Sequence, residues 1–315
     1  MSSGRRVLVL GAGVSGLSSA VRLVEAGYSV EIWARERPPH TTSAVAAAIW
    51  YPYLAEPPER VLAWAGVTLH EFARLSADPA TGIVMREGVE VFPEAVTDPP
   101  WASVVPGFRR ARSDELPAGF TDGYAMRLPV IDMSIYLGWL EQQVLAAGAT
   151  LLERSIQSFD EVRGAADVVV NCTGLGARDL CHDPSLVGVR GQIVVVDGSE
   201  GSTFLIDEAT LSYIIPRVHD TVLGGTADEN VCDARVDDQT AASILDRCRQ
   251  LMPALARAPV RGHKVGIRPC RTTVRLERES LGGVSVVHNY GHGGSGVTLS
   301  WGCADEVVAL ASAST

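Results

Sequence analysis

The first part of the chain changes its hydrophobic period twice within a short distance. Residues 6–10 (RVLVL) are apolar on both alternating sides, which predicts a strand buried on both faces. Residues 15–26 then predict a helix, and Gly27 stands where that helix would end. The apolar residues that share one side of this helix are Leu17, Ala20, Val21 and Val24. With a second strand over 28–33 (YSVEIW), the segment has the composition and size of a βαβ unit.

The rest of the chain alternates between this style and a different one. Residues 55–135 are rich in Pro and Gly and change character often, whereas 188–226 carries several β-type runs (GQIVVVD, STFLI, SYIIP, TVLGG) that predict an antiparallel sheet. Residues 132–148 predict a helix and 166–172 another buried strand. Near the end, 283–288 predicts a strand that is followed by a glycine loop and a final helix from about Gly296.

These patterns predict an α/β protein with two interleaved domains. A Rossmann-like cofactor-binding domain would comprise residues 1–54, 132–187 and 266–315. A second, mainly antiparallel-sheet domain that binds the substrate would comprise residues 55–131 and 188–265.

Composition narrows the function classes. A net charge of −10 over 315 residues disfavours nucleic-acid binding, because phosphate requires a basic surface. No apolar stretch reaches the roughly 18–20 residues of a membrane span, and glycines break the run after Arg5-Arg6, so we expect neither a membrane anchor nor an export signal. The six cysteines form no CxxC pair, which predicts no zinc site and suits a reducing cytoplasm. Lys264 is the only lysine, which disfavours Schiff-base chemistry.

The first motif with a chemical meaning is Gly11-Ala-Gly13-Val-Ser-Gly16. In a strand–turn–helix context these glycines permit the tight turn, the approach of a pyrophosphate and close packing of helix against strand. Glu36 follows Gly16 by twenty residues, as an acid that binds ribose should. The motif predicts a dinucleotide site but does not separate NAD from FAD.

Several later segments together resemble the D-amino-acid oxidase family, and they occur in that family's order over nearly the whole chain. The two most specific are GIRPCRTTVRLERE (266–279) and HNYGHGGSGVTLSWGCA (288–304). The others are HTTSAVAAAIWYPY (40–53), ADVVVNCTGLGA (166–177), VRGQI (189–193), SYIIP (212–216) and TVLGGT (221–226). The family is similar to D-aspartate, glycine and sarcosine oxidases.

The resemblance implies noncovalently bound FAD. Gly11, Gly13 and Gly16 would hold the pyrophosphate, and either Arg35 or Glu36 would lie at the adenosine ribose. The other residues that the resemblance places at the cofactor are Thr41, Thr42, Ser43, Ala47, Ala48, Ile49, Ile156, Gly293, Gly294, Ser295, Gly296, Val297 and Thr298. A helix that begins at this C-terminal glycine loop would stabilise negative charge on a reduced flavin.

The resemblance also implies the substrate residues. Arg268, in the GIRP segment, would grip the substrate carboxylate with its planar guanidinium, and the hydroxyl of Tyr213 would bind the same carboxylate. The carbonyl of Gly294 would accept a hydrogen bond from the amine. His288 and His292 are expected to be structural, since the family's reaction uses no side-chain base. The α-hydrogen would leave as hydride, oxygen would be reduced to hydrogen peroxide, and the imino acid would hydrolyse to a 2-oxo acid and ammonia.

The expected substrates are free neutral D-amino acids, with basic ones as an open alternative. A D-aspartate oxidase would place an arginine where Ala227 stands, although Arg217 could replace it if the chain stays extended to that residue. A glycine or sarcosine oxidase and a flavin- or NAD-binding protein without catalytic activity are the remaining alternatives. The stretch between Phe204 and Tyr213 is too short for a lid that carries a second tyrosine. The sequence leaves open whether the chain is a monomer or a homodimer.

Overall fold

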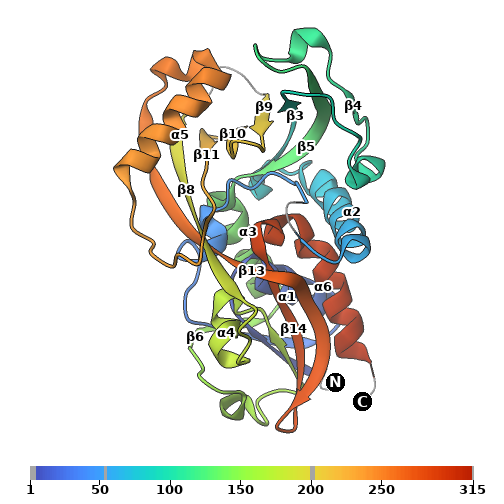
Figure 1. Cartoon of the computed structure of the whole chain (residues 1–315). Helices are drawn as coiled ribbons and strands as arrows, with labels where there is room; N and C mark the ends of the chain where they lie inside the picture. Colours follow the sequence, from blue (N-terminus) through green and yellow to red (C-terminus); the bar gives the residue numbers. More distant parts are fainter. Residues whose placement is uncertain (1–4, 53–54, 199–202, 314–315) are drawn as a thin grey trace.

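The computed structural model describes residues 5–52, 55–198 and 203–313, and their strands form one long mixed sheet with helices packed on it (Figure 1). The strands are β1 (Arg6–Leu10), β2 (Ser29–Ala34), β3 (Ile83–Phe92), β4 (Arg109–Arg110), β5 (Asp122–Ile131), β6 (Thr150–Glu153), β7 (Val168–Asn171), β8 (Val187–Asp197), β9 (Phe204–Asp207), β10 (Ser212–Pro216), β11 (Asp220–Gly224), β12 (Asp228–Glu229), β13 (Val260–Leu281) and β14 (Val284–His292). The α-helices are α1 (Val14–Glu25), α2 (Pro58–Leu75), α3 (Met133–Ala146), α4 (Ala177–Leu180), α5 (Asp238–Leu251) and α6 (Gly296–Ser312).

One half of the sheet is parallel and carries the N-terminal βαβ unit. Its strands run in the order β14-β7-β1-β2-β6, each parallel to its neighbour. In β1, Val7 and Val9 belong to the core beneath α1, α3 and α6, while Leu8 and Leu10 belong to a smaller core on the opposite face. This alternation explains why every position from Val7 to Leu10 is apolar.

The other half of the sheet is mainly antiparallel. Strands β8, β11, β10 and β9 pair antiparallel in that order, β9 then pairs parallel with β3, and β5 and β4 complete the edge. Helix α5 packs on β8, β10 and β11 over a second core.

Strand β13 joins the two halves. Its first part pairs with β8 and its second part with β14, so one strand of 22 residues runs from one half into the other (Figure 1). The sheet is therefore continuous, and the residues at the middle of β13 lie between the parallel and the antiparallel half.

The predicted fold class is confirmed, with differences in detail. Helix α1 ends as predicted: the N–H of Gly27 bonds to the carbonyl of Val24 and the N–H of Tyr28 to that of Leu23, with Gly27 at φ +87°. Val21 and Val24 are only partly buried, and Leu23 is fully buried in their place.

The sequence reading missed several elements, namely helices α2 and α5, the strand pair β3–β5 and the length of β13.

Within the described residues, no helix is long and apolar enough to cross a bilayer.

Candidate active site

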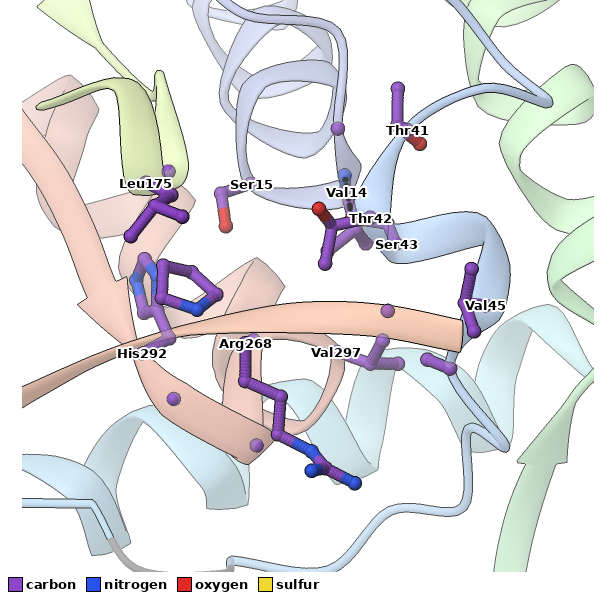
Figure 2. A pocket seen from close by; sticks show the side chains of 18 of the residues that line it. Val14, Ser15, Thr41, Thr42, Ser43, Val45, Leu175, Arg268, His292 and Val297 are labelled. Carbon is purple, nitrogen blue, oxygen red and sulfur yellow. Dashed lines mark hydrogen bonds between the residues drawn. The ribbon is translucent and has the colours of Figure 1, made fainter. Parts of the chain in front are cut away.

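A cavity of about 490 Å³ opens where β13 passes between the two halves of the sheet. Its walls come from the turn after β1, the 3-10 segment Thr42–Val45, the middle of β13 and the loop between β14 and α6. It is lined by all of the site residues expected from the sequence except Gly16 and Ser295. Figure 2 shows Thr42 and Ser43 gathered beside Val14 at the start of α1, while Arg268 extends from β13 into another part of the cavity.

At one end of the cavity the glycine turn brings backbone very close to backbone. A Cβ on Gly16 would lie 2.0 Å from the carbonyl oxygen of Gly11, and one on Gly11, at φ +107°, would lie 2.5 Å from the carbonyl oxygen of Cys172. Helix α1 therefore begins directly against β1 and β7. Gly16 shapes the cavity from behind and does not line it.

The N-terminus of α1 is arranged to receive an anion. Its N-cap Gly13 has no side chain, and the backbone N–H of Val14 donates to Ser43 Oγ at 3.0 Å. Thr41 Oγ1 is buried without a hydrogen-bond partner, although Thr41 lines the cavity. A helix N-terminus with hydroxyl groups around it, one of them unsatisfied, fits the pyrophosphate of a dinucleotide.

Directly after β2, Arg35 and Glu36 both line the cavity and form an exposed ion pair at 3.5 Å. Ile156 also lines this part, and the guanidinium of Arg154 lies 3.8 Å above the ring of Trp33. This apolar and aromatic surface suits a nucleobase. The geometry does not choose between Arg35 and Glu36 as the ribose contact.

The segment that contains Ala47, Ala48 and Ile49 is held in place by backbone hydrogen bonds. The carbonyl of Ala48 accepts from the N–H of Ile131 at 2.7 Å, and Ile49 forms an isolated bridge with Val130. These small and apolar side chains line the cavity, which suits the packing of a flavin ring.

The glycine loop after β14 lines the same cavity. Gly293, at φ +56°, begins a 3-10 turn that leads into α6, and Gly293, Gly294, Gly296, Val297 and Thr298 line the cavity. Ser295 is fully buried and does not line it. The N-terminus of α6 thus lies at the cavity, where it would stabilise negative charge.

Arg268 lies in the middle of β13, and its guanidinium occupies the space above Gly191, where a Cβ would come within 2.4 Å of Nη1. Its Nη1 donates to the carbonyl of Thr226 at 2.9 Å. Within the described part of the chain no carboxylate forms an ion pair with Arg268. The cavity therefore contains a guanidinium that is positioned but not neutralised.

Tyr213 stands on β10, and its ring lies over Gly224 and Gly225. A Cβ on Gly224 would lie 1.8 Å from the ring carbon that carries the hydroxyl. The GG pair of the TVLGGT segment is thus required to make room for the ring. Both Tyr213 and Arg268 line the same cavity.

Other arginines near this region form ion pairs. Arg271 pairs with Asp183 at 2.9 Å, and Arg275 pairs with Glu277 at 2.7 Å. Arg217 is 4% exposed and makes a bidentate contact with Asp220, with both distances 2.7 Å. Because it does not line the cavity, Arg217 cannot act there as the second cation of a D-aspartate site.

The two candidate histidines have hydrogen-bond partners. His288 Nε2 lies 2.8 Å from Glu279 Oε1, and His288 does not line the cavity. His292 lines the cavity, with Nε2 2.9 Å from Asn289 Oδ1. Burial lowers the pKa of His292 to about 4, so this ring is neutral near pH 7.

The sequence reading missed a polar cluster at the antiparallel end of the cavity. The hydroxyl of Tyr51 donates to Glu90 Oε1 at 2.8 Å, and Glu208 Oε2 lies 3.5 Å from the same hydroxyl. Tyr51 and Glu208 line the cavity, and Glu90 is 1% exposed. One signal was present: Glu90 stands between Val89 and Val91 in the apolar last part of strand β3.

Comparisons with known proteins agree with this geometry. The family model for FAD-dependent oxidoreductases of the DAO type matches residues 6–310. The chain is 51% identical to a D-amino-acid oxidase of Rubrobacter xylanophilus over 98% of this chain and 96% of that one. It is 36% identical to a D-aspartate oxidase of Homo sapiens over 98% and 94%. Among solved structures, glycine oxidase from Geobacillus kaustophilus has a similar fold, with a TM-score of 0.81, 19% identity and coverage of 98% and 95%.

The residues present fit the cofactor that this family requires. The glycine turn, the unsatisfied Thr41 hydroxyl and the glycine loop lie along a single cavity that is long enough to be lined by both β1 and α6. With a family match over nearly the whole length, the chain belongs to the DAO family of FAD-dependent oxidoreductases.

Proposed function

We propose that this protein catalyses the oxidative deamination of free D-amino acids, with FAD as the cofactor and oxygen as the electron acceptor. The observation that carries the proposal is the guanidinium of Arg268, which lacks an ion-pair partner among the described residues and lies in the same cavity as the dinucleotide fingerprint and the C-terminal glycine loop. The similarity to a relative named D-amino-acid oxidase supports the same conclusion.

Arg268 and Tyr213 would hold the substrate carboxylate. A guanidinium offers two parallel N–H donors to a carboxylate, and the Tyr213 hydroxyl adds a third. With the amine donating to the carbonyl of Gly294, three points of the substrate are fixed. Only one enantiomer can then direct its α-hydrogen toward the flavin while its side chain enters the pocket, and the relative named D-amino-acid oxidase supports the D-enantiomer.

Bound FAD supplies the acceptor for the α-hydrogen, which leaves as hydride, and is the site at which oxygen is reduced to hydrogen peroxide. The protein contributes orientation and electrostatics. His292 is neutral and hydrogen-bonded to Asn289, so it is not the base that takes the α-hydrogen. The N-terminus of α6 would stabilise negative charge on the bound cofactor. One D-amino acid, one O₂ and one water give one 2-oxo acid, one ammonia and one hydrogen peroxide.

The FAD would be bound noncovalently by the residues of the fingerprint and by Thr41, Thr42 and Ser43. Two parts of the chain would share the work: residues 1–54, 132–187 and 266–315 for the cofactor, and residues 55–131 and 188–265 for the substrate. The sheet supports this division. Strands β14, β7, β1, β2 and β6 pair in parallel, while β8, β11, β10 and β9 pair antiparallel, and Tyr213 lies on β10 of this second group.

A cytoplasmic location is part of the proposal. It is supported by the six cysteines, none of which is joined in a disulfide. For assembly, a monomer and a homodimer both stay open, and sedimentation of the purified holoprotein decides between them.

The test is to supply purified holoprotein with D-methionine in air and to measure hydrogen peroxide and the 2-oxo acid together. Equal amounts of the two products from D-methionine, and none from L-methionine, are expected. A yellow protein that forms neither product would instead be the flavin-binding protein without catalytic activity.

A further inference from the structure

At the antiparallel end of the cavity, Tyr51 connects two glutamates: Glu208, which lines the cavity, and Glu90, which is buried and does not line it. Glu90 lies on β3, Glu208 lies in the turn after β9, and the Tyr51 hydroxyl stands between them, 2.8 Å from Glu90 Oε1 and 3.5 Å from Glu208 Oε2. The Tyr51 backbone is fixed as well: its N–H and its carbonyl both bond to Thr298 Oγ1, at 3.1 and 2.9 Å. Tyr51 therefore connects this cluster to the start of α6.

The register of the sheet places Glu90 on the face of the sheet that is turned toward the cavity. Glu90 pairs with Ile206 across β3 and β9, and Ile206 pairs with Tyr213 across β9 and β10. Ile206 lines the cavity, whereas Val89 and Val91, the neighbours of Glu90, pack into the core under α5. Glu90, Ile206 and Tyr213 thus form one row across three strands on the side that faces the substrate.

The buried glutamate is incompletely satisfied. Glu90 is 1% exposed, its Oε1 accepts from Tyr51, and its Oε2 has no hydrogen-bond partner. Because the Tyr51 hydroxyl donates its one hydrogen to Glu90 in a hydrogen bond, its oxygen can still accept a hydrogen bond from a ligand in the cavity. Glu208 adds an exposed carboxylate beside that oxygen.

No basic side chain neutralises this pair of glutamates in the described part of the chain. Arg247 approaches the same strands from α5, but it bonds to Ser212 and through it reaches Thr210 and Asp207, not Glu90 or Glu208. Burial, with Glu208 and Asp207 nearby, raises the pKa of Glu90 to about 7. A cation bound here would relieve both the charge repulsion and the unsatisfied oxygen.

We propose that Tyr51, Glu90 and Glu208 form a subsite for the positively charged end of a substrate side chain, so that D-arginine and D-lysine are preferred substrates. This inference rests on the proposed oxidase function and deepens it. The cavity would then carry opposite charges at two places, with Arg268 binding the substrate carboxylate and the glutamates binding the side-chain cation.

The spacing agrees with a long side chain. Tyr213 and Glu90 stand two strand spacings apart in their row, or about 10 Å. The methyl side chain of a D-alanine bound near Tyr213 would not reach the glutamates, whereas the extended side chain of D-lysine or D-arginine would. A second carboxylate, as in D-aspartate or D-glutamate, would meet negative charge instead of the arginine that a D-aspartate site needs.

The experiment compares D-arginine with D-citrulline, which has the same shape but a neutral urea in place of the guanidinium. The ratio of kcat/KM for the two is measured in the wild-type holoenzyme and in Glu208→Gln, Glu90→Gln and Glu87→Gln. Glu87→Gln is the matched control, because it removes the same charge from the same strand, whereas Glu87 is exposed and its position three residues before Glu90 puts it on the opposite face of the sheet. Glu208 lies in an exposed turn, so its variant tests the proposal even if Glu90→Gln fails to fold.

We expect a wild-type ratio of about ten or more, a drop of about three- to tenfold in Glu208→Gln and in Glu90→Gln, and no drop in Glu87→Gln. A wild-type ratio near one, with D-methionine still oxidised, would overturn the cation subsite and leave the oxidase function intact. Equal drops in all three variants would also overturn it, because the effect would then be one of net charge.

If no D-amino acid is oxidised, binding still decides the question. The holoprotein is titrated by calorimetry with δ-guanidinovalerate and δ-ureidovalerate, which have the carboxylate and the long chain but no α-amine and cannot react. Tighter binding of the guanidino compound, weakened in Glu208→Gln, would support the subsite. Equal binding of the two compounds would refute it.

Discussion

The two ends of the cavity recognise their ligands by different means. At the parallel-sheet end, recognition depends on absent side chains: Gly11, Gly13 and Gly16 let backbone groups approach, and the N–H of Val14 bonds to Ser43. At the antiparallel end, recognition depends on charged side chains: Arg268 for the substrate carboxylate, and Glu90 and Glu208 for the side-chain cation. Substitutions at the first end should therefore act through space and cofactor binding, and those at the second through charge and substrate choice.

The largest effect is expected from Arg268→Ala. Without the guanidinium the substrate carboxylate loses its partner, which should lower kcat/KM for D-methionine by about 10²–10⁴-fold, or roughly 3–5 kcal/mol. FAD should stay bound, and Arg268→Lys should rescue poorly because an ammonium lacks the planar fork. Steady-state kinetics and the flavin absorbance check this; near-normal kcat/KM in the alanine variant would mean that another group holds the carboxylate.

Gly16→Ala should impair cofactor binding and stability, whereas Arg268→Ala should impair activity and leave FAD bound. Its Cβ would lie 2.0 Å from the carbonyl oxygen of Gly11, so α1 must move away from β1. We expect a loss of about 1–3 kcal/mol in stability and weaker retention of FAD. Gly138→Ala is the control, because a Cβ there meets nothing within 4 Å in the middle of α3. Equal FAD retention and equal melting temperatures in the two variants would refute the close approach.

Glu90→Gln should change how stability depends on pH. The folded pKa of Glu90, about 7, lies above its unfolded value of 4.5, so the folded state binds the proton more tightly. This group therefore makes the wild-type protein less stable as pH rises from about 4.5 to 7, by on the order of 1–3 kcal/mol. Urea unfolding of both proteins at pH 5 and pH 8 measures it: glutamine should be relatively more favourable at pH 8. A difference that does not vary with pH would contradict a raised pKa.

Tyr213→Phe should have the smallest effect on catalysis. Only one hydrogen bond to the substrate carboxylate is lost, while the ring still fills the space over Gly224 and Gly225. The expected cost is roughly 0.5–3 kcal/mol in kcat/KM, mostly in KM. A loss as large as that of Arg268→Ala would show that the hydroxyl does more than bind the carboxylate.

The two ends also differ in how well the sequence predicted them. The βαβ unit could be predicted because its signals are local: β1 is apolar on both alternating faces, and the glycines of the turn follow within six residues. Helix α2 was missed although its buried residues Val61, Trp64, Ala65, Leu69 and Phe72 have helical spacing. The prolines around it suggested a loop, but Pro58 occupies the first turn of the helix, where proline is tolerated.

The glutamate subsite could not be predicted in this way, because it depends on contacts between residues that are distant in sequence. Glu90 reaches the cavity side only through the pairing of β3 with β9, and Tyr51 only through its bonds to Thr298. Arg217 shows the converse. Extended spacing from Tyr213 permitted it to face the site, but Asp220, three residues on, binds it instead.

The most direct test of the central claim is to mix the holoprotein anaerobically with D-methionine or L-methionine and to follow the flavin absorbance. The account predicts that D-methionine bleaches the flavin, that L-methionine does not, and that the colour returns when oxygen is admitted. Bleaching by L-methionine to a comparable extent, or no bleaching by any D-amino acid, would contradict it.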